Sequence, residues 1–270
     1  MGLNVNSNIQ SIIARRHTER ATRNLLSSQE KLSYLLRINR AADDAAGLAI
    51  AERFQSQVRQ LNQEVNSFQS GTNLTQVAEG GLEVQSDALG RIRELAVQAS
   101  NGTLNDDQRA ASNEEAQQLL QEIDATAQNT EFNGVAPIAN GTQEVVLDPS
   151  GDVSVTTEES TTTSLGIDGV DLSTQAGARA ALDSLDNAQT EISSNRASLG
   201  AQQNRLRASI EQRESNAVDL QEAEFRIRDL DVGRAIIEQT RNEILLQAGA
   251  LGVLRGGAIQ SQTVSSLLAG

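Results

Sequence analysis

The chain has 270 residues, a net charge of −14, no cysteine and only 2% aromatic residues. Compact cores of this length usually contain more large ring side chains, so the composition favours long helices that pack along narrow seams. It also excludes disulfides and thiolate chemistry, and no segment reaches the roughly 18 uninterrupted apolar residues of a membrane span.

The negative charge is concentrated in the middle of the chain. Residues 101–190 contain 16 acidic and 2 basic residues, a difference that equals the net charge of the whole chain. Such a segment is more typical of a solvated surface than of a cation site. A small basic spot at Arg91 and Arg93 lies in acidic surroundings, which argues against binding of nucleic acid.

The first expected element is a helix within residues 3–36. The single histidine, His17, lies among arginines in this helix and is interpreted as a surface residue. The apolar positions of the segment are Leu3, Val5, Ile9, Ile12, Ile13, Leu25, Leu26, Leu32 and Leu36.

A second, long helix is predicted over residues 44–99. Its apolar row recurs every seven residues, at Phe54, Leu61, Phe68, Thr75, Leu82, Leu89 and Ala96. This spacing is typical of a helix that packs against another at coiled-coil angles. Gly80, Gly81 and Gly90 lie inside the helix, and close approach of a neighbouring helix would explain them.

A third helix is predicted from Asp106 to about Asn129. Asn105 is a suitable N-cap, and acidic residues are favourable near the positive helix end. Pro137 and Gly141 then break the helical pattern. The Val- and Thr-rich runs 142–148 and 152–160, joined by Pro-Ser-Gly, predict a β-hairpin, followed by a looped entry to the next helix.

The helical pattern returns at about residue 174, and we predict an unbroken helix over 178–234. Its seam begins at Leu185, Ile192, Leu199 and Leu206, which are spaced by seven, and then steps by four to Ile210. At 1.5 Å per residue, this helix is about 85 Å long and the helix over 44–99 is about 84 Å long. An antiparallel pair of them would bring the two chain termini to the same end.

The C-terminal segment 244–270 contains ten Leu, Ile or Val residues and one charged side chain, Arg255. We expect helices over 3–36 and 237–268 to meet as a two-helix unit. That unit buries too little apolar surface to offset the entropy of ordering both ends. The ends are therefore predicted to be disordered in the monomer and to fold against other copies of the chain. An intramolecular bundle in a conventional monomer is the alternative.

No catalytic or metal-binding motif is recognisable. One histidine and no cysteine leave no ordinary Ser–His–Asp or Cys–His set, and neither His-Glu-x-x-His nor a phosphate-binding loop occurs. Paired carboxylates, such as Asp106 with Asp107, are interpreted as helix caps and salt-bridge partners. We expect a protein that is not an enzyme and binds no cofactor or metal.

Six segments resemble bacterial flagellin. They are LRINRAADDAAGLAIAERF (36–54), RIRELAVQASNGT (91–103), EIDATAQNTEFNGV (122–135), LGIDGVDLSTQAGARAALDSLDNA (165–188), LGAQQNRL (199–206) and FRIRDLDVGRAIIEQTRNEILLQAG (225–249). The resemblance extends over about nine-tenths of the chain, with the motifs in the family's order.

The resemblance implies a mainly α fold: a long antiparallel coiled-coil-like helical bundle with a small β-hairpin region, and terminal helices that form a separate core domain. A terminal-helix filament-core domain is expected from 1–46 and 235–270, and a helical-bundle domain from 47–138 and 164–234. A short outward β-hairpin at 139–163 would replace the variable domain.

The implied function is that of a structural subunit that self-polymerises into the bacterial flagellar filament for swimming motility. The subunit would be exported unfolded through the flagellar type III channel and would end in the extracellular filament. A flagellar hook–filament junction protein is the alternative. Implied partners are other copies in a helical homopolymer, an export chaperone on the C-terminal helix, hook-associated and cap proteins, and host flagellin receptors, but no nucleic acid or membrane.

The residues expected to carry polymerisation are apolar positions of the terminal helices: Ile9, Ile12, Leu25, Leu32, Leu245, Leu246, Leu251, Leu254, Ile259, Leu267 and Leu268. The resemblance also implies a host-receptor epitope at Arg91, Arg93, Glu94, Leu95 and Gln98. One departure from the family pattern is Leu35, which stands where the family usually has glycine.

Overall fold

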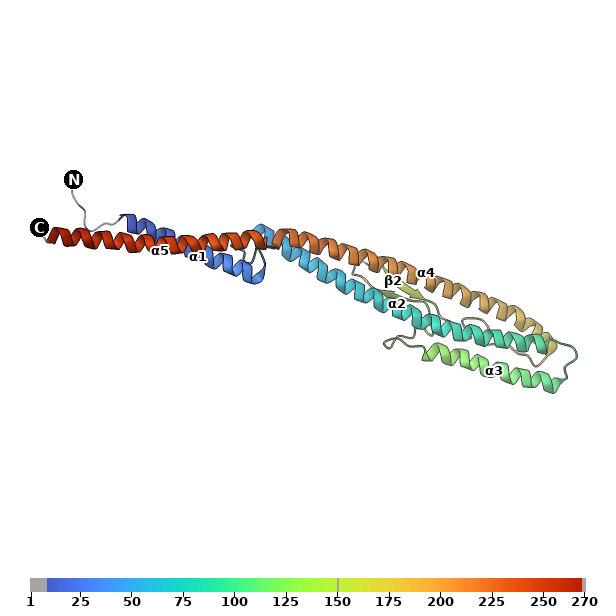
Figure 1. Cartoon of the computed structure of the whole chain (residues 1–270). Helices are drawn as coiled ribbons and strands as arrows, with labels where there is room; N and C mark the ends of the chain where they lie inside the picture. The colour runs from blue at the N-terminus through green and yellow to red at the C-terminus, as the bar shows by residue number, and fades with distance from the viewer. Residues whose placement is uncertain (1–8, 150, 269–270) are drawn as a thin grey trace. The chain divides into compact units, whose positions relative to one another are not determined.

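The computed structural model describes residues 9–149 and 151–268, with the backbone alone described for residue 10 and residues 255–268. In this part of the chain the elements are, in order, α1 (Ile9–Tyr34), α2 (Ala45–Ala99), α3 (Asp106–Asn129), β1 (Gln143–Val146), β2 (Ser154–Thr157), α4 (Gln175–Arg228) and α5 (Val232–Leu268) (Figure 1). The expected mainly α fold with one small hairpin is confirmed.

The described residues form two compact units. The terminal unit contains the residues up to Val58 and those from Val218 onward, and the middle unit contains Arg59–Ala217. Helices α2 and α4 therefore contribute to both units. The domain boundaries implied by the family resemblance, at 46/47 and 234/235, stay a prediction.

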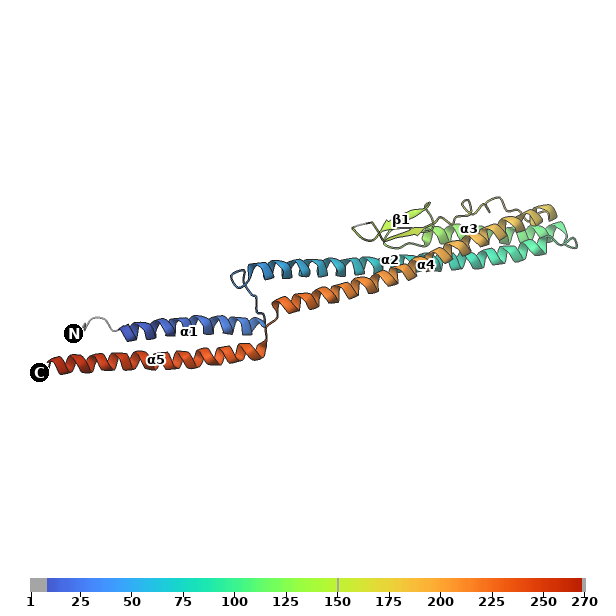
Figure 2. The same cartoon turned by 90° about the horizontal axis from the view of Figure 1, so that it is seen from above.

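The core of the middle unit is a seam of heptad-spaced side chains from α2 and α4. Its buried members include Phe68, Leu82, Leu89, Leu185, Ile192, Leu199 and Leu206. Gln189 Nε2 donates to Ser86 Oγ at 2.8 Å, and Gln203 Nε2 donates to Glu79 Oε2 at 3.0 Å. Because later residues of α4 face earlier residues of α2, the two helices are antiparallel, as Figure 2 also shows. The predicted seam is confirmed.

Helix α3 covers one side of this seam. Its N-terminus has the predicted cap, since Asn105 Oδ1 accepts from the backbone N–H of Gln108 at 2.8 Å and the Gln108 side chain accepts from the backbone N–H of Asn105 at 3.2 Å. This reciprocal pair is a capping box, which satisfies two backbone donors that the helix leaves open. Ala116, Leu120 and Ile123 then bury the inner face of α3 in the same core.

The hairpin also matches its prediction. Strands β1 and β2 are antiparallel, and Val145 pairs with Val155. Val153 and Val155 join Phe68, Leu74 and Leu206 in a second buried cluster, so the hairpin covers part of the α2–α4 seam. Gln202 fastens the edge of β2, since Thr156 N–H donates to its Oε1 and its Nε2 donates to the Thr156 carbonyl, both at 2.8 Å.

A buried side chain links α2 to α3 and to the segment between β2 and α4. Gln85 Nε2 donates to the carbonyls of Ile123 at 3.1 Å and Ser160 at 3.0 Å, and its Oε1 accepts from Ser160 Oγ at 2.7 Å. Asp124 accepts from the backbone N–H and the hydroxyl of Thr162, both at 2.8 Å. These bonds supply the polar partners that a buried loop backbone requires.

The prediction of an unbroken helix over 178–234 is wrong, because α4 ends at Arg228 and α5 begins at Val232. The connector between α1 and α2 (residues 35–44) bonds to the backbone at this break: Arg37 N–H donates to the Arg228 carbonyl at 2.8 Å, and Leu230 N–H donates to the Leu35 carbonyl at 3.2 Å. Asp231 then caps α5, since its Oδ1 accepts from Arg234 N–H at 3.1 Å.

Helix α1 ends at Tyr34 in a Schellman motif. The N–H of Leu36 donates to the Lys31 carbonyl at 3.2 Å, and Leu35 between them has a φ of 56°. This position is normally glycine, because a side chain in the left-handed region crowds its own carbonyl at a cost of roughly 1–2 kcal/mol. Leu35 is therefore a strained residue at the start of the connector.

Three of the five glycines inside α2, Gly80, Gly81 and Gly90, have different surroundings. A Cβ at Gly81 would lie 2.7 Å from both Ile138 Cδ1 and Thr130 Oγ1, which is closer than packed atoms can approach. A Cβ at Gly80 or Gly90 would meet nothing within 4 Å. Gly81 therefore has a close neighbour, but it is the segment that follows α3 and not the expected helix, and within this chain Gly80 and Gly90 have none.

Candidate functional site

The candidate site lies in the terminal unit, where α1 and α5 run side by side (Figures 1 and 2). Small residues allow this close approach: a Cβ at Gly249 would be 2.5 Å from Thr18 Oγ1, and one at Gly252 would be 3.8 Å from Ala14 Cβ. The pairing of later α1 residues with earlier α5 residues makes the helices antiparallel.

Large apolar side chains are mostly left outside this narrow contact. Among the described side chains of α1 and α5, the buried hydrophobic ones are Ala21 and Ala235. Leu254 is 69% exposed. Monomeric proteins seldom leave contiguous apolar faces in water, so such faces mark interaction sites.

Five of the eight predicted polymerisation residues whose side chains are described belong to these uncovered faces. Ile9, Ile12, Leu245, Leu251 and Leu254 are exposed. Leu25, Leu32 and Leu246 are half-buried. Ile259, Leu267 and Leu268 lie in α5, and their side chains are outside the described set.

The structure adds seven exposed apolar residues of α1 and α5 that the predicted polymerisation set left out: Ile13, Leu26, Tyr34, Val232, Ile236, Ile237 and Ile244. We call the exposed apolar side chains of α1 and α5 the apolar terminal faces. Val232 and Ile236 could have been found in the sequence, had the start of α5 been placed at Val232. Ile237 and Ile244 already lay inside the expected helix over 237–268.

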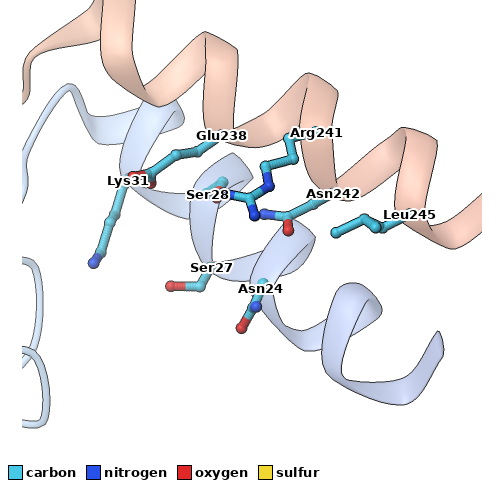
Figure 3. A pocket seen from close by; sticks show the side chains of 8 residues that line it. All are labelled: Asn24, Ser27, Ser28, Lys31, Glu238, Arg241, Asn242 and Leu245. Atoms are coloured by element: carbon cyan, nitrogen blue, oxygen red, sulfur yellow. The ribbon is translucent and has the colours of Figure 1, made fainter. Parts of the chain in front are cut away.

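A polar groove of about 460 Å³ lies between α1 and α5. It is lined by Asn24, Ser27, Ser28, Lys31, Glu238, Arg241, Asn242 and Leu245 (Figure 3). Figure 3 shows Arg241 and Asn242 reaching from α5 toward α1, while Lys31 extends away from them. The groove presents hydrogen-bonding amides, hydroxyls and charges of both signs, with no nucleophile and base in contact.

The connector is held firmly against α1. Glu30 Oε1 lies 2.6 Å from Arg40 Nη2 and accepts from Asn39 Nδ2 at 3.2 Å. Asp43 Oδ2 accepts from the backbone N–H groups of Arg40 at 3.0 Å and Asn39 at 3.2 Å. The bond from Arg40 is the main reason that the pKa of Asp43 lies below its usual value, and Lys31 adds to it. Favourable bonds to the charged carboxylate stabilise that form.

The residues of the expected host-receptor epitope lie on α2 in the middle unit. Arg91 forms ion pairs with Glu115 at 2.8 Å and Glu94 at 2.9 Å, and the bond to Glu115 contributes most to its raised pKa. Arg93 pairs with Asp186 at 2.7 Å, which raises its pKa. The pairs with Glu115 and Asp186 fasten α2 to α3 and α4.

Leu95 differs from the other epitope residues, because it is only 3% exposed and packs in the main core of the middle unit. Gln98, like Arg91, Arg93 and Glu94, is exposed. In this structure the expected epitope therefore presents four polar side chains, and Leu95 instead stabilises the helix that carries them.

The described part of the chain contains neither a cluster of metal ligands nor a helix suited to span a membrane. Across residues 9–149 and 151–268, no three His, Cys, Asp or Glu side chains converge to hold a metal ion. None of the helices in the described part of the chain has the length and apolar character needed to cross a bilayer.

Two family models match the chain. The bacterial flagellin N-terminal helical region matches residues 5–141, and the bacterial flagellin C-terminal helical region matches residues 182–268. The chain belongs to the bacterial flagellin family. The matches include α1, α5 and the paired parts of α2 and α4, so the elements that form the candidate site are those of a flagellin.

Curated relatives match this flagellin over nearly its full length. A flagellin of Halalkalibacterium halodurans is 36% identical, over 98% of this chain and 99% of the relative. The flagellar filament 33 kDa core protein of Treponema phagedenis is 34% identical over the same shares. The flagellin of Bacillus subtilis is 36% identical over 89% of this chain and 91% of its own.

Two solved structures are also similar to this chain. A protein of Vibrio parahaemolyticus, described as a putative flagellar hook-associated protein, matches with a TM-score of 0.59 and 14% identity, over 68% of this chain and 99% of its own. The crystal structure of Bacillus cereus flagellin is 32% identical, over 54% of this chain and 86% of its own, with a TM-score of 0.48. At 14% identity the Vibrio protein shares the fold, which gives no preference to a hook-junction function.

Proposed function

We propose that this flagellin is the structural subunit of a flagellar filament and that the apolar terminal faces are the surfaces that polymerise. The uncovered side chains of α1 and α5 carry the proposal. Burial of one large aliphatic side chain is worth about 1.5–3 kcal/mol. A monomer forgoes this stabilisation at Leu251, Leu254 and Ile237, whereas a polymer recovers it without changing the middle unit.

The terminal helices are also proposed to order only during assembly. Their buried hydrophobic side chains are Ala21 and Ala235 in the described part of the two helices, so their mutual contact, where Gly249 approaches Thr18, buries little large apolar surface. The conformational entropy of two free helices opposes that contact. Other copies of the chain would supply the missing burial. Such a subunit can pass through a narrow export channel unfolded and fold on arrival.

The test is polymerisation of truncated and substituted chains. Deletion of residues 244–270 should abolish filaments in electron microscopy and sedimentation, while the helical signal of the middle unit remains. Leu254→Asp should raise the critical concentration at least about tenfold, because a charge would enter an apolar contact. Leu254→Met keeps the volume and apolar character and should polymerise nearly as well as the original chain. Equal polymerisation of the Asp and Met variants would refute the proposal.

The partners of the filament subunit follow from the same proposal. An export chaperone would cover the C-terminal helix before assembly, and hook-associated and cap proteins would contact the growing polymer. The filament would be extracellular. A hook–filament junction protein, the alternative, would stay monomeric under conditions in which a filament subunit polymerises from sheared seeds.

Host receptors are a further proposed partner, through Arg91, Arg93, Glu94 and Gln98. All four side chains are exposed, although both arginines are already paired with acidic residues of the same chain. The chain is also proposed to have no enzymatic activity. Its flagellin relatives are structural proteins, and a peptidase assay on purified filaments should give no turnover.

A further inference from the structure

The connector contains a strained residue whose side chain is largely exposed. Leu35 adopts the left-handed conformation that glycine adopts without a steric penalty. Its side chain is nevertheless 57% exposed. Within one molecule, the leucine therefore brings strain without the burial that would offset it.

Two aromatic side chains flank the same junction. Tyr34 directly precedes Leu35 and is 61% exposed. Phe225 is 54% exposed, and its carbonyl accepts from the N–H of Asp229, which pairs with Leu36. The chain has one tyrosine and four phenylalanines, and the other three, Phe54, Phe68 and Phe132, are half-buried or buried. A chain this poor in aromatic residues thus leaves two of them exposed in the terminal unit, one at the end of α1 and one in the last turn of α4.

We infer that Tyr34, Leu35 and Phe225 form an anchor that is buried by a second copy of this chain. The inference rests on the proposed polymerisation. Aromatic side chains are enriched among the residues that dominate interface energies. Burial against a neighbouring copy would offset the strain at Leu35. A glycine at this position would avoid the strain but would have no side chain to bury.

A second copy is the occupant because the anchor continues the apolar terminal faces. Leu26 is exposed on α1 before the connector. Val232, Ile236 and Ile237 are exposed at the start of α5, directly after the break between α4 and α5 to which the connector bonds. Backbone bonds and the Glu30 pairs hold the connector in place, so the anchor is presented by a fixed segment.

Three substitutions at Leu35 separate an anchor from a tolerated strain. Leu35→Gly removes both the strain and the side chain, Leu35→Ala keeps the strain but removes most of the side chain, and Leu35→Met keeps both. An anchor predicts that the Gly and Ala variants raise the critical concentration of seeded polymerisation by at least about fivefold. The Met variant should stay within about twofold. Phe225→Ala should act in the same direction as Leu35→Ala.

The overturning result is equally definite. If Leu35→Gly lowers the critical concentration or leaves it unchanged, the residue is only a strained position and no anchor exists. A variant that polymerises normally but is secreted poorly would assign these side chains to an export partner, and would also overturn the inference.

Labelling gives a second readout, because the chain contains no native cysteine. The Leu35→Cys variant should react with a maleimide reagent in the monomer and lose at least about tenfold in rate in the filament. Val146→Cys, exposed in the hairpin, is the control and should react in both states. Equal reactivity of the Leu35→Cys thiol in monomer and filament would refute the anchor. Failure of the unmodified chain to form filaments would instead refute the proposed function, and the anchor with it.

Discussion

Asp43 couples the connector to pH. Its carboxylate accepts two backbone N–H bonds and lies 3.6 Å from Lys31 Nζ, so its pKa in the folded connector is below the usual 3.8. A depressed pKa means that the interaction stabilises the fold above the unfolded pKa and that this stabilisation is lost as pH falls through the lower, folded pKa. The Asp43 bonds therefore stabilise the connector more above about pH 3.8 than below it.

The lowered pKa of Asp43 predicts how the Asp43→Asn substitution changes the stability of the filament. At pH 7 the variant should dissociate at a lower denaturant concentration than the original chain, because a neutral amide replaces the carboxylate in its bonds. The difference should shrink as pH falls below 3.8, where the carboxylate of the original chain becomes protonated. Denaturant titrations of filaments at several pH values measure both effects.

Asp219→Asn is the matched control. It makes the same change of charge at an exposed α4 residue of the terminal unit. A pH-independent difference at Asp43, or an equal effect at Asp219, would contradict the role assigned to the Asp43 bonds.

Single residues differ in how far the sequence predicts their environment. Asn105 could be predicted as a cap because its partner, Gln108, is three positions away. The bonds of Gln85 reach 38 and 75 positions along the chain, so no local pattern indicates them. The left-handed conformation of Leu35 could not be predicted either. A leucine in place of the family's usual glycine does not reveal whether the backbone stays left-handed at that position.

The glycines of α2 give a prediction at the level of the helix. Gly90→Ala should stabilise the isolated chain by up to about 1 kcal/mol, because alanine favours the helix and the new methyl group meets nothing. Gly81→Ala should destabilise it despite the same gain in helix propensity, because Ile138 and Thr130 occupy the space and Ile138 is buried. Denaturant unfolding followed by circular dichroism compares the two, and a stabilising Gly81→Ala would show that the packing around Ile138 is loose.

Helices were predicted best where spacing and burial act together. The heptad row of α2 and the row from Leu185 to Leu206 could be predicted because both lie in one continuous seam. The break at 229–231 was missed, since no proline or glycine lies within it and the connector that bonds to it lies about 190 positions away. Asp231 was the available signal, as a cap for a new helix.

For the whole molecule, we predict different protection of the two ends in monomer and filament. Amide hydrogens of residues 9–34 and 245–254 should exchange quickly in dilute monomer, because the α1–α5 contact buries little large apolar surface. The same amides should exchange far more slowly in filaments. Amides of the buried seam, such as those of Leu89, Ile192 and Leu199, should stay protected in both states.

Hydrogen exchange read by mass spectrometry makes this comparison on the unmodified chain. Strong protection of both ends in dilute monomer would favour the conventional intramolecular bundle instead. Whether the ends are ordered depends on how many copies of the chain are present. The sequence therefore indicates which faces are uncovered, but the partner that covers them has to be inferred.

The pairing of Leu36 with Asp229 has a mechanical consequence. At this point two crossings of the polypeptide, 35–38 and 227–230, are bonded to one another by Arg37 N–H to the Arg228 carbonyl, by Leu230 N–H to the Leu35 carbonyl and by Arg228 Nε to the Ile38 carbonyl. Tension or torque applied to α1 and α5 is therefore shared between two bonded segments of the chain and is not carried by one segment alone. A rotating fibre built from such subunits would resist unravelling at the place where each helix stops.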